Sequence, residues 1–468
     1  MFKKIFFFVL LYFILNFSFS QKRILNKEEL KNAKEFTSLK IALKNSDKVN
    51  KLNLKNKALL NFPMEILELP YLQELNLNNN RIKKIPENID RLKNLKNLFL
   101  RNNRLKTLPE EISELKFLNE LDISKNNFEI IPEIIFNCKQ LQILDISKNK
   151  IDSISEKISK LQKLEILNIY DNKINSVHAN FSNLKSLKKI NISNNLLEDL
   201  EFGENLESLE EINLGNNKLT SFSEKIGSLK NLEFLYCEKN QISKLPISIK
   251  NLKKLKHFKL SNNKIFDIPK EIGHLKNLQY LYINKNELEN LPKEITNITF
   301  LKYLDASSNK LSSLPLNMKN MKNLQFLNIK KNNFSEFPIS VCDIENLKSL
   351  NMGNNKIKIL PSEIGKMKNL EELNIKSNEI AQIPADIILL KKMQKFSLHE
   401  NKIKELPYEI VLLENLKRLN LRDNLIKKMP FDVKMLTKLK QLVLTNNPIS
   451  QKKINELKLE LPKTKIFY

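Results

Sequence analysis

The sequence predicts an α/β solenoid, a fold in which short units repeat along the chain and stack on one another. Two observations indicate this class. A pattern of leucines, an asparagine and a proline recurs from residue 49 almost to the end of the 468-residue chain. Within each copy, alternating apolar and polar residues, typical of a strand, precede apolar residues at helical spacing.

The repeated unit has the form LxxLxLxxNxLxxLPxxIxxLxx and is 23 residues long. We number its positions as slots, with the first leucine at slot 1 and the asparagine at slot 9. The asparagine recurs at positions 80, 103, 126, 149, 172, 195, 217, 240, 263, 286, 309, 332, 355, 378, 401, 424 and 447. Every step is 23 residues except one of 22. A degenerate first copy begins at Val49, with Lys57 at the asparagine position, so about eighteen units are expected in residues 49–449.

Each recurring residue type suits its slot in the unit for a physical reason. The LxxLxL part predicts a half-buried strand, and stacked units pair these strands in parallel. The asparagine amide offers two donors and an acceptor to the backbone of its own turn and of a neighbouring turn. Proline at slot 15 suits the first position of a short helix or 3₁₀ turn. The apolar residues at slots 18 and 21 return to the core.

This pattern resembles the leucine-rich-repeat family, and in particular its 23-residue, bacterial-type LPxxIxxL repeats. The resemblance covers about 400 of the 468 residues. It implies a horseshoe with a parallel β-sheet on the concave face and short 3₁₀ or α turns on the convex face. It also implies a binding protein whose partners contact the concave face.

The first 20 residues are expected to be a signal peptide. Lys3 and Lys4 precede an apolar stretch over residues 5–17, and the small residues Ser18 and Ser20 then favour cleavage after Ser20. The protein is therefore predicted to be secreted, extracellular or associated with the cell envelope, with no membrane span in the mature chain. A retained N-terminal anchor is the alternative.

Both ends of the array are expected to be capped, because a terminal repeat would otherwise expose its apolar face. Residues 21–48 predict a helical N-terminal cap with Leu30, Ala33, Phe36 and Leu39 on its apolar side. Residues 450–468 predict a C-terminal cap. In it, a helix carries Ile454, Leu457 and Leu461, and an extended segment follows from Thr464 to Tyr468.

Few residues are suited to catalysis or metal binding, so we predict that the protein is not an enzyme and has no cofactor or metal. The four histidines fall in four different repeats: His178, His257, His274 and His399. Cys138 and Cys237 take core slots and lie too many repeats apart for a disulfide. Cys342, at slot 19, is expected to be the exposed thiol.

An aromatic cluster on the outward strand slots is the predicted binding site. Slots 3 and 5 of five consecutive repeats carry Phe234, Tyr236, His257, Tyr280, Tyr282, Tyr303 and Phe326. Stacked strands should place these rings about 5 Å apart in one stripe. Exposed aromatic groups anchor protein interfaces because they offer a large contact area at little entropic cost. Alternatively, the rings stack across strands and only stabilise the sheet.

The formal charge of the chain is +26, or +24 once Lys3 and Lys4 are removed. The lysines are spread along the repeats, which argues against nucleic acid as a partner. Beside the aromatic slots lie Lys259, Lys264, Lys285, Lys310, Lys330 and Lys331. Among them, Lys259, Lys285 and Lys330 are predicted as secondary partner contacts. A protein partner, acidic if these lysines contact it, is favoured over an anionic glycan.

The repeats between about 150 and 230 depart from the pattern. Their proline slots carry Ser155, His178, Glu201 and Ser223, and Gly203 falls near an inward slot. Such a break could alter the curvature or create a convex contact site, and simple drift in a tolerant array explains it equally well.

The leading functional hypothesis is therefore recognition of a macromolecule, most readily a protein, on the concave face. Two alternatives remain at this point. The protein could hold anionic glycan or envelope polymer by diffuse positive charge, as a structural or adhesive surface protein. It could also be an intracellular scaffold if residues 1–20 are not a signal peptide. The oligomeric state and the choice between free secretion and surface retention are left open.

Overall fold

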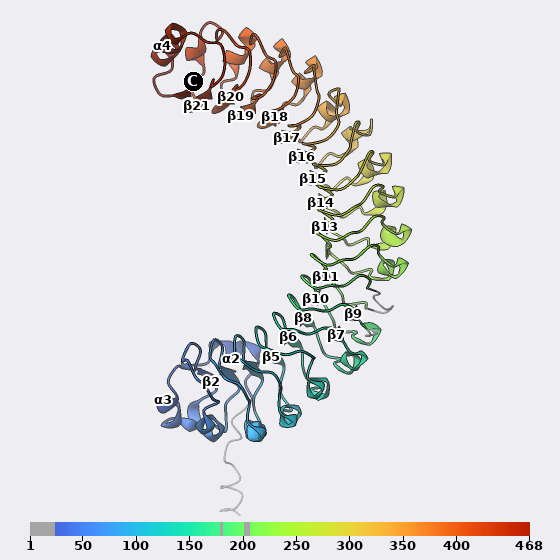
Figure 1. The fold of residues 1–468 in the computed structure, drawn as a ribbon, viewed down its shortest axis with the longest axis vertical. Coiled ribbons are helices and arrows are strands. Elements are labelled where there is room, and N and C mark those ends of the chain that lie inside the picture. The colour runs from blue at the N-terminus through green and yellow to red at the C-terminus, as the bar shows by residue number, and fades with distance from the viewer. Residues whose placement is uncertain (1–23, 178–180, 201–205) are drawn as a thin grey trace, which may run out of the picture. The chain divides into compact units, whose positions relative to one another are not determined.

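The computed structural model of the chain describes residues 24–177, 181–200 and 206–468. The predicted signal peptide, His178, Glu201 and Gly203 lie outside the described residues. The chain divides into unit 1, residues 1–190, and unit 2, residues 191–468. Each unit is a solenoid in which parallel strands form one side and 3₁₀ turns form the other (Figure 1).

In the described part of unit 1, seven strands belong to one parallel sheet and pair in sequence order. These are β1 (Glu35–Phe36), β2 (Lys51–Asn53), β3 (Glu74–Asn76), β4 (Asn97–Phe99), β5 (Glu120–Asp122), β6 (Ile143–Asp145) and β8 (Ile166–Asn168). A second, short pairing joins β7 (Ser153–Ile154) and β9 (Ser176–Val177). The helices are α2 (Lys27–Asn32), α3 (Leu39–Leu43), η1 (Ser46–Lys48), η2 (Met64–Glu68), η3 (Glu87–Arg91), η4 (Glu110–Glu114), η5 (Glu133–Asn137), η6 (Glu156–Lys160) and η7 (Phe181–Asn183). Strand β10 (Lys189–Asn191) lies at the division between the units.

Unit 2 continues the same repeat. Its strands are β11 (Glu211–Asn213), β12 (Phe234–Tyr236), β13 (His257–Lys259), β14 (Tyr280–Tyr282), β15 (Tyr303–Asp305), β16 (Phe326–Asn328), β17 (Ser349–Asn351), β18 (Glu372–Asn374), β19 (Lys395–Ser397), β20 (Arg418–Asn420), β21 (Gln441–Val443) and β22 (Lys465–Phe467). Its turns are η8 (Glu224–Ser228), η9 (Ile247–Asn251), η10 (Lys270–His274), η11 (Lys293–Asn297), η12 (Met318–Asn320), η13 (Ile339–Asp343), η14 (Ser362–Lys366), η15 (Ala385–Leu389), η16 (Tyr408–Leu412) and η17 (Val433–Met435). The strands line the concave side of this unit (Figure 1).

The core of each unit is a set of ladders formed by equivalent apolar side chains of successive repeats. Leu235, Leu281 and Leu304, all at slot 4, are fully buried, and so are Ile249 and Leu252 at slots 18 and 21. A repeat alone could not bury these groups, so stacking supplies the hydrophobic stabilisation. The predicted leucine-rich-repeat solenoid, with strands on the concave face and 3₁₀ turns on the convex face, is confirmed in each unit.

The slot-9 asparagines form a second ladder inside the core. Asn263 Nδ2 donates to the carbonyl oxygens of Cys237 and Leu260, both at 2.9 Å, and its Oδ1 accepts from the Ile242 N–H at 3.0 Å. Each asparagine therefore joins its own turn to that of the preceding repeat, as the sequence predicts. The residue before it is held in the left-handed region, with φ 57° at Asn262.

Proline lies one position earlier than predicted. Pro86 has φ −71° and ψ 150°, an extended conformation, and η3 begins at the next residue. Proline is thus the N-cap, where its fixed φ suits an extended residue. In two of the irregular repeats, Ser155 and Ser223 take this place, and their hydroxyl oxygens accept from Lys157 N and Lys225 N at 3.3 Å. These serines cap the turn through their side chains.

The two ends have different caps. The N-terminal segment contains the helices α2 and α3, but Phe36, which was expected on a helical face, lies in β1, which pairs with β2, and is buried at the end of the core. A strand satisfies the backbone groups along the edge of β2, which a helix could not do. At the other end, α4 (Gln451–Glu460) buries Ile454 and Leu457, and β22 pairs with β21.

The expectation of an exposed Cys342 thiol is wrong. Cys342 is only 2% exposed, and burial raises the pKa of its thiol to about 12. Slot 19 faces the turn of the next repeat, as the buried Gly273 and Thr296 at the same slot also indicate. Cys138 and Cys237 are buried as predicted, and none of the three forms a disulfide.

Candidate partner-binding site on the concave face

The predicted aromatic residues come from five adjacent strands of unit 2. Strands β12 to β16 pair in register, so the slot-3 residues Phe234, His257, Tyr280, Tyr303 and Phe326 follow one another across the sheet. Tyr236 and Tyr282 occupy slot 5 of the same face. Their strand neighbours at slot 4 point into the core, as alternation requires. We call these seven residues the aromatic stripe.

The rings of the aromatic stripe are in contact, but they do not form a single line. Phe234 and His257 have centroids 5.0 Å apart, and His257 stacks on Tyr280 at 4.4 Å. The Tyr303 ring lies 5.0 Å from Tyr282, in the neighbouring slot-5 row, and 6.0 Å from Phe326. The stripe therefore shifts between rows at β14.

Lys259 connects the slot-5 rings of the stripe. Its Nζ lies 4.7 Å from the ring centroid of Tyr236 and 5.7 Å from that of Tyr282, within the range of cation–π attraction. Burial, reinforced by nearby Glu211, raises the pKa of Tyr236, and burial with neighbouring Tyr280 raises that of Tyr282. Both hydroxyls therefore remain protonated at neutral pH and can donate hydrogen bonds.

His257 is held in its neutral form within the stripe. Burial lowers the pKa of its imidazole, and the positive charges of Lys259 and Lys256 lower it further. A neutral ring stacks on Tyr280 without a charge to desolvate. Phe326, at the end of the stripe, is 42% exposed, while the other rings of the stripe are half-buried.

The other predicted lysines lie at the borders of this surface. Lys285 is exposed and occupies the left-handed position before its asparagine, with φ 55°. Lys330 is half-buried at the end of β16, where its N–H donates to Asn328 Oδ1 at 3.3 Å. Lys264 and Lys310 bond to Gln241 and Glu287 of the preceding repeats, at 2.9 and 3.2 Å. Among the predicted contacts, Lys259 is the lysine in contact with the rings.

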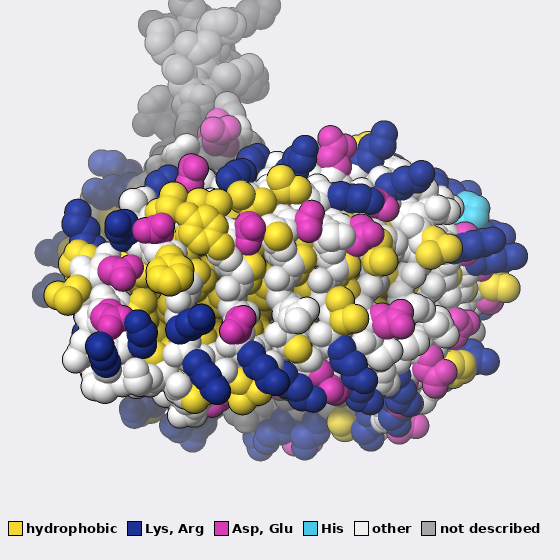
Figure 2. Space-filling model, turned by 90° about the horizontal axis from the view of Figure 1, so that it is seen from above, with side chains coloured by type: hydrophobic (Ala, Val, Ile, Leu, Met, Phe, Trp, Pro, Cys, Tyr) yellow, Lys and Arg dark blue, Asp and Glu magenta, His cyan; other side chains and the backbone are white. Residues whose placement is uncertain are grey.

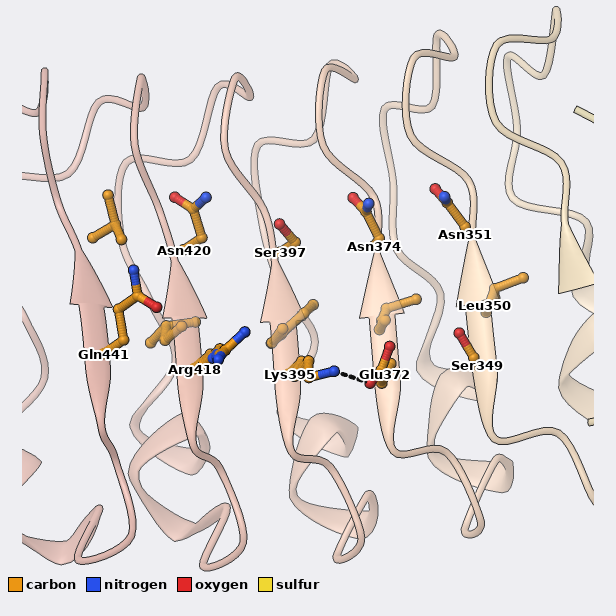
Figure 3. A pocket seen from close by; sticks show the side chains of 14 residues that line it. Ser349, Leu350, Asn351, Glu372, Asn374, Lys395, Ser397, Arg418, Asn420 and Gln441 are labelled. Atoms are coloured by element: carbon orange, nitrogen blue, oxygen red, sulfur yellow. Dashed lines mark hydrogen bonds and ion pairs between the residues drawn. The ribbon is translucent and has the colours of Figure 1, made fainter. Parts of the chain in front are cut away.

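A second concave feature, which the sequence analysis missed, follows the stripe on β17 to β21. A cavity of about 320 Å³ lies over these strands, and we call it the polar trough. Its slot-3 row consists of Ser349, Glu372, Lys395, Arg418 and Gln441. Its slot-5 row includes Asn351, Asn374, Ser397 and Asn420. Figure 3 shows the two rows side by side on successive strands, with Lys395 paired to Glu372. The repeated asparagines at slot 5 were the available signal in the sequence.

His399 contacts two residues that line the polar trough. Its Nδ1 lies 3.1 Å from both Ser397 Oγ and Asn420 Nδ2, so it acts as an acceptor there and the proton is carried by Nε2. Burial, followed by the charge of Lys376, lowers the pKa of His399. The imidazole is therefore neutral at pH 7 and orients the Asn420 amide.

The concave face of unit 1 is partly covered. Helix α2 contributes Lys27, Leu30 and Lys31 to a cavity of about 380 Å³ that is also lined by Glu74 and Glu120. A hydrogen bond fixes the residues just before α2 to the sheet: the Leu25 N–H donates to Gln73 Oε1 at 3.0 Å. Burial and the charge of Glu74 raise the pKa of Glu120.

Charges on the protein surface are mixed in sign. On the face seen in Figure 2, Lys and Arg side chains are interspersed with Asp and Glu. Many pair with the equivalent position of a neighbouring repeat, as Lys256 Nζ does with Glu233 Oε2 of the preceding repeat at 2.6 Å. Within residues 24–177, 181–200 and 206–468, no cluster of three His, Cys, Asp or Glu could hold a metal, and no helix could span a membrane. The absence of catalysis stays a prediction.

Models of leucine-rich repeats match most of the chain. A leucine-rich repeat region matches residues 87–211 and 293–379, and a two-copy repeat matches 207–254. Two further leucine-rich-repeat models match residues 245–288 and 368–426, and residues 71–92. No curated protein matches the chain.

Solved structures of the same kind are similar over nearly the whole length. A leucine-rich-repeat protein of Leptospira interrogans is 30% identical, with a TM-score of 0.72 over 93% of this chain and 100% of that chain. The plant peptide hormone receptor RGFR1, in complex with RGF2, is 27% identical, with a TM-score of 0.68 over 83% and 65%. The ectodomain of the Arabidopsis thaliana receptor kinase GASSHO1/SCHENGEN3, in complex with Casparian strip integrity factor 2, is 26% identical, with a TM-score of 0.62 over 90% and 56%. The chain belongs to the leucine-rich-repeat family.

Proposed function

We propose that this protein is a recognition protein that binds a protein partner through the aromatic stripe of unit 2. The observation that carries this proposal is a contiguous group of seven rings on the solvent side of five strands whose other slots serve the core. The plant peptide hormone receptor RGFR1, which has a similar fold, is described in complex with RGF2, and this supports a polypeptide as the partner class.

Partner binding explains the rings better than sheet stability alone. Parallel pairing and the buried slot-4 ladder already hold these strands in register, as they do in the repeats that carry Glu or Ser at slot 3. The rings also leave part of their area exposed, 42% in the case of Phe326. Partly exposed tyrosines with protonated hydroxyls offer both apolar contact and a hydrogen-bond donor.

Secretion is part of the same proposal. The Lys3–Lys4 pair, the apolar stretch and the small residues at Ser18 and Ser20 support cleavage after Ser20 and action outside the cell. The three free thiols are buried and therefore poorly reactive, so they do not conflict with a location outside the cell.

Affinity capture with a matched control tests the proposal. The protein is immobilised as wild type, as the Tyr280→Ala, Tyr282→Ala, Tyr303→Ala variant, and as Phe99→Ala, Tyr170→Ala, which removes two outward rings of unit 1. We expect a polypeptide from extracellular or surface fractions to bind the wild type and the control but not the stripe variant. Binding that survives about 0.5 M salt would agree with ring contacts rather than diffuse charge. Equal capture by all three proteins would contradict the assignment to the stripe.

A further inference from the structure

The asparagines of the polar trough have a fixed amide orientation. Asn351 Oδ1 accepts from the Gly353 N–H and Asn374 Oδ1 from the Lys376 N–H, both at 3.2 Å. Asn420 Oδ1 accepts from the Arg422 N–H at the same distance. Each of these bonds closes a turn at the end of a strand, so the acceptor side of the amide is already occupied.

The opposite side of each amide is therefore a donor aimed away from the turn. In the part of the chain that the structure describes, the Nδ2 groups of Asn351 and Asn374 have no hydrogen-bond partner, although both residues line the cavity. An NH₂ group can only donate. The slot-5 row thus presents hydrogen-bond donors at a spacing of about 4.8 Å, the distance between neighbouring strands.

The slot-3 row adds a positive charge next to these donors. Glu372 is neutralised by its ion pair with Lys395. Arg418 lies on the next strand, lines the same cavity, and has no ion-pair partner among the described residues. Its guanidinium offers five donors and is always charged. The polar trough is therefore rich in donors and carries one uncompensated cation.

We propose that the polar trough binds an acidic segment of the protein partner, whose carboxylates accept hydrogen bonds from Asn351, Asn374 and Arg418. This inference rests on the proposed function and extends it to a second subsite. The two surfaces are adjacent, because Phe326 at the end of the aromatic stripe pairs in register with Ser349 at the start of the trough. One partner can therefore place apolar groups on the stripe and acidic groups in the trough.

The protein itself supplies an isosteric test of this idea. Aspartate takes the same slot in other repeats and closes the same turn: the Ser307 N–H donates to Asp305 Oδ1 at 3.0 Å, and the Ser147 N–H to Asp145 Oδ1 at 2.9 Å. An Asn374→Asp change should therefore keep the fold and replace only the outward NH₂ by a carboxylate oxygen. Asn76→Asp makes the same change in unit 1, where Asn76 Oδ1 accepts from the Asn78 N–H at 3.0 Å.

The experiment measures binding of a fluorescein-labelled octaglutamate peptide by fluorescence anisotropy at about 0.1 M salt. We expect wild type to bind octaglutamate but not octaglutamine. Asn374→Asp and Arg418→Gln should each weaken binding about tenfold, because each removes donors to carboxylate and the former adds repulsion. Asn76→Asp should change the affinity less than twofold, although it alters the net charge of the protein as much as Asn374→Asp does.

Two results would overturn the inference. The first is that wild type does not bind octaglutamate. The second is that Asn374→Asp and Asn76→Asp weaken binding equally, which would indicate attraction by net charge alone. The stripe variant Tyr280→Ala, Tyr282→Ala, Tyr303→Ala separates this test from that of the proposed function. It should bind octaglutamate like wild type, because the peptide has no apolar groups for the rings. If partner capture proved not to depend on the aromatic stripe, the expected binding of octaglutamate to the trough would not change.

Discussion

Slot 5 of the repeat carries Asp122 and Asp145 on adjacent strands of unit 1, beside amides such as that of Asn76, whereas in unit 2 it carries Tyr236 and Tyr282 and then, in the polar trough, mostly asparagines. The backbone turn after these residues is the same in both units. The Ser124 N–H donates to Asp122 Oδ1 at 2.9 Å, much as other N–H groups do to the asparagines. The difference therefore lies in which side chains project from the outward side of the sheet.

This comparison separates scaffold from surface. Buried slots repeat because each must fit the equivalent residue of two neighbours, while outward slots contact solvent and are free to vary. Unit 1 uses that freedom for carboxylates and amides, and α2 covers part of its sheet. Unit 2 uses it for rings, amides and Arg418, which has no ion-pair partner among the described residues. Both proposed binding surfaces therefore lie in unit 2.

The largest expected effect tests whether the scaffold is indeed common to both units. Asn103 in unit 1 bonds to the carbonyls of Leu77 and Leu100 at 3.0 and 2.9 Å, which matches Asn263 in unit 2. Replacing either by Ala leaves buried backbone groups unsatisfied and should destabilise its region by about 3 kcal/mol. Hydrogen exchange of the neighbouring repeats measures the loss. A loss in one unit that is several times that in the other would contradict a shared scaffold.

Acidification should affect the two units in opposite directions. In unit 2 the pKa of His257 and that of His399 are lowered by burial, so the unfolded chain takes up protons first and stability is lost as the pH falls below about 6.5. In unit 1, burial raises the pKa of Glu120 and that of Asp122, so stability is lost as the pH rises through their folded values and is recovered on acidification. Hydrogen exchange at pH 7 and pH 4, corrected for intrinsic rates, should reveal the contrast. Replacing both histidines by Gln should remove the unit 2 part.

The smallest effect is expected from making unit 1 resemble unit 2. Burial raises the pKa of Asp122, and the nearby charge of Asp145 raises it further. Asp122→Asn removes a carboxylate that is costly to ionise but keeps the turn, as Asn191 does when it accepts from the Ser193 N–H at 3.1 Å. We expect a rise of about 1 °C in the thermal midpoint at pH 7 that disappears near pH 4. A fall at pH 7 would mean that the ionised carboxylate stabilises the turn.

Much of the fold could be predicted from residue order. The 23-residue period predicts that Leu235, Ile249 and Asn263 lie in the core, without knowledge of any contact. Residues that recur at the same slot are the ones that stacked repeats bury against one another. The presence of Phe234, His257 and Tyr280 on one outward face follows from the same period. The N-terminal cap was harder to predict. Phe36 lies in a strand that covers the end of the core, but the apolar residues around it have helical spacing and did not indicate a strand.

The tertiary structure decided what the period leaves free. The burial of Cys342 depends on the neighbouring turn packing against slot 19, and a pattern of single repeats does not contain that contact. The approach of Tyr303 to Tyr282, rather than a single line of rings, depends on side-chain rotation. Most consequential for the second subsite, the outward NH₂ of Asn374 exists because its oxygen is held by Lys376. The sequence by itself determined which residues face the partner side, since alternation follows from strand geometry alone. Only the folded chain decided which of their atoms remain available, because this depends on bonds to neighbours.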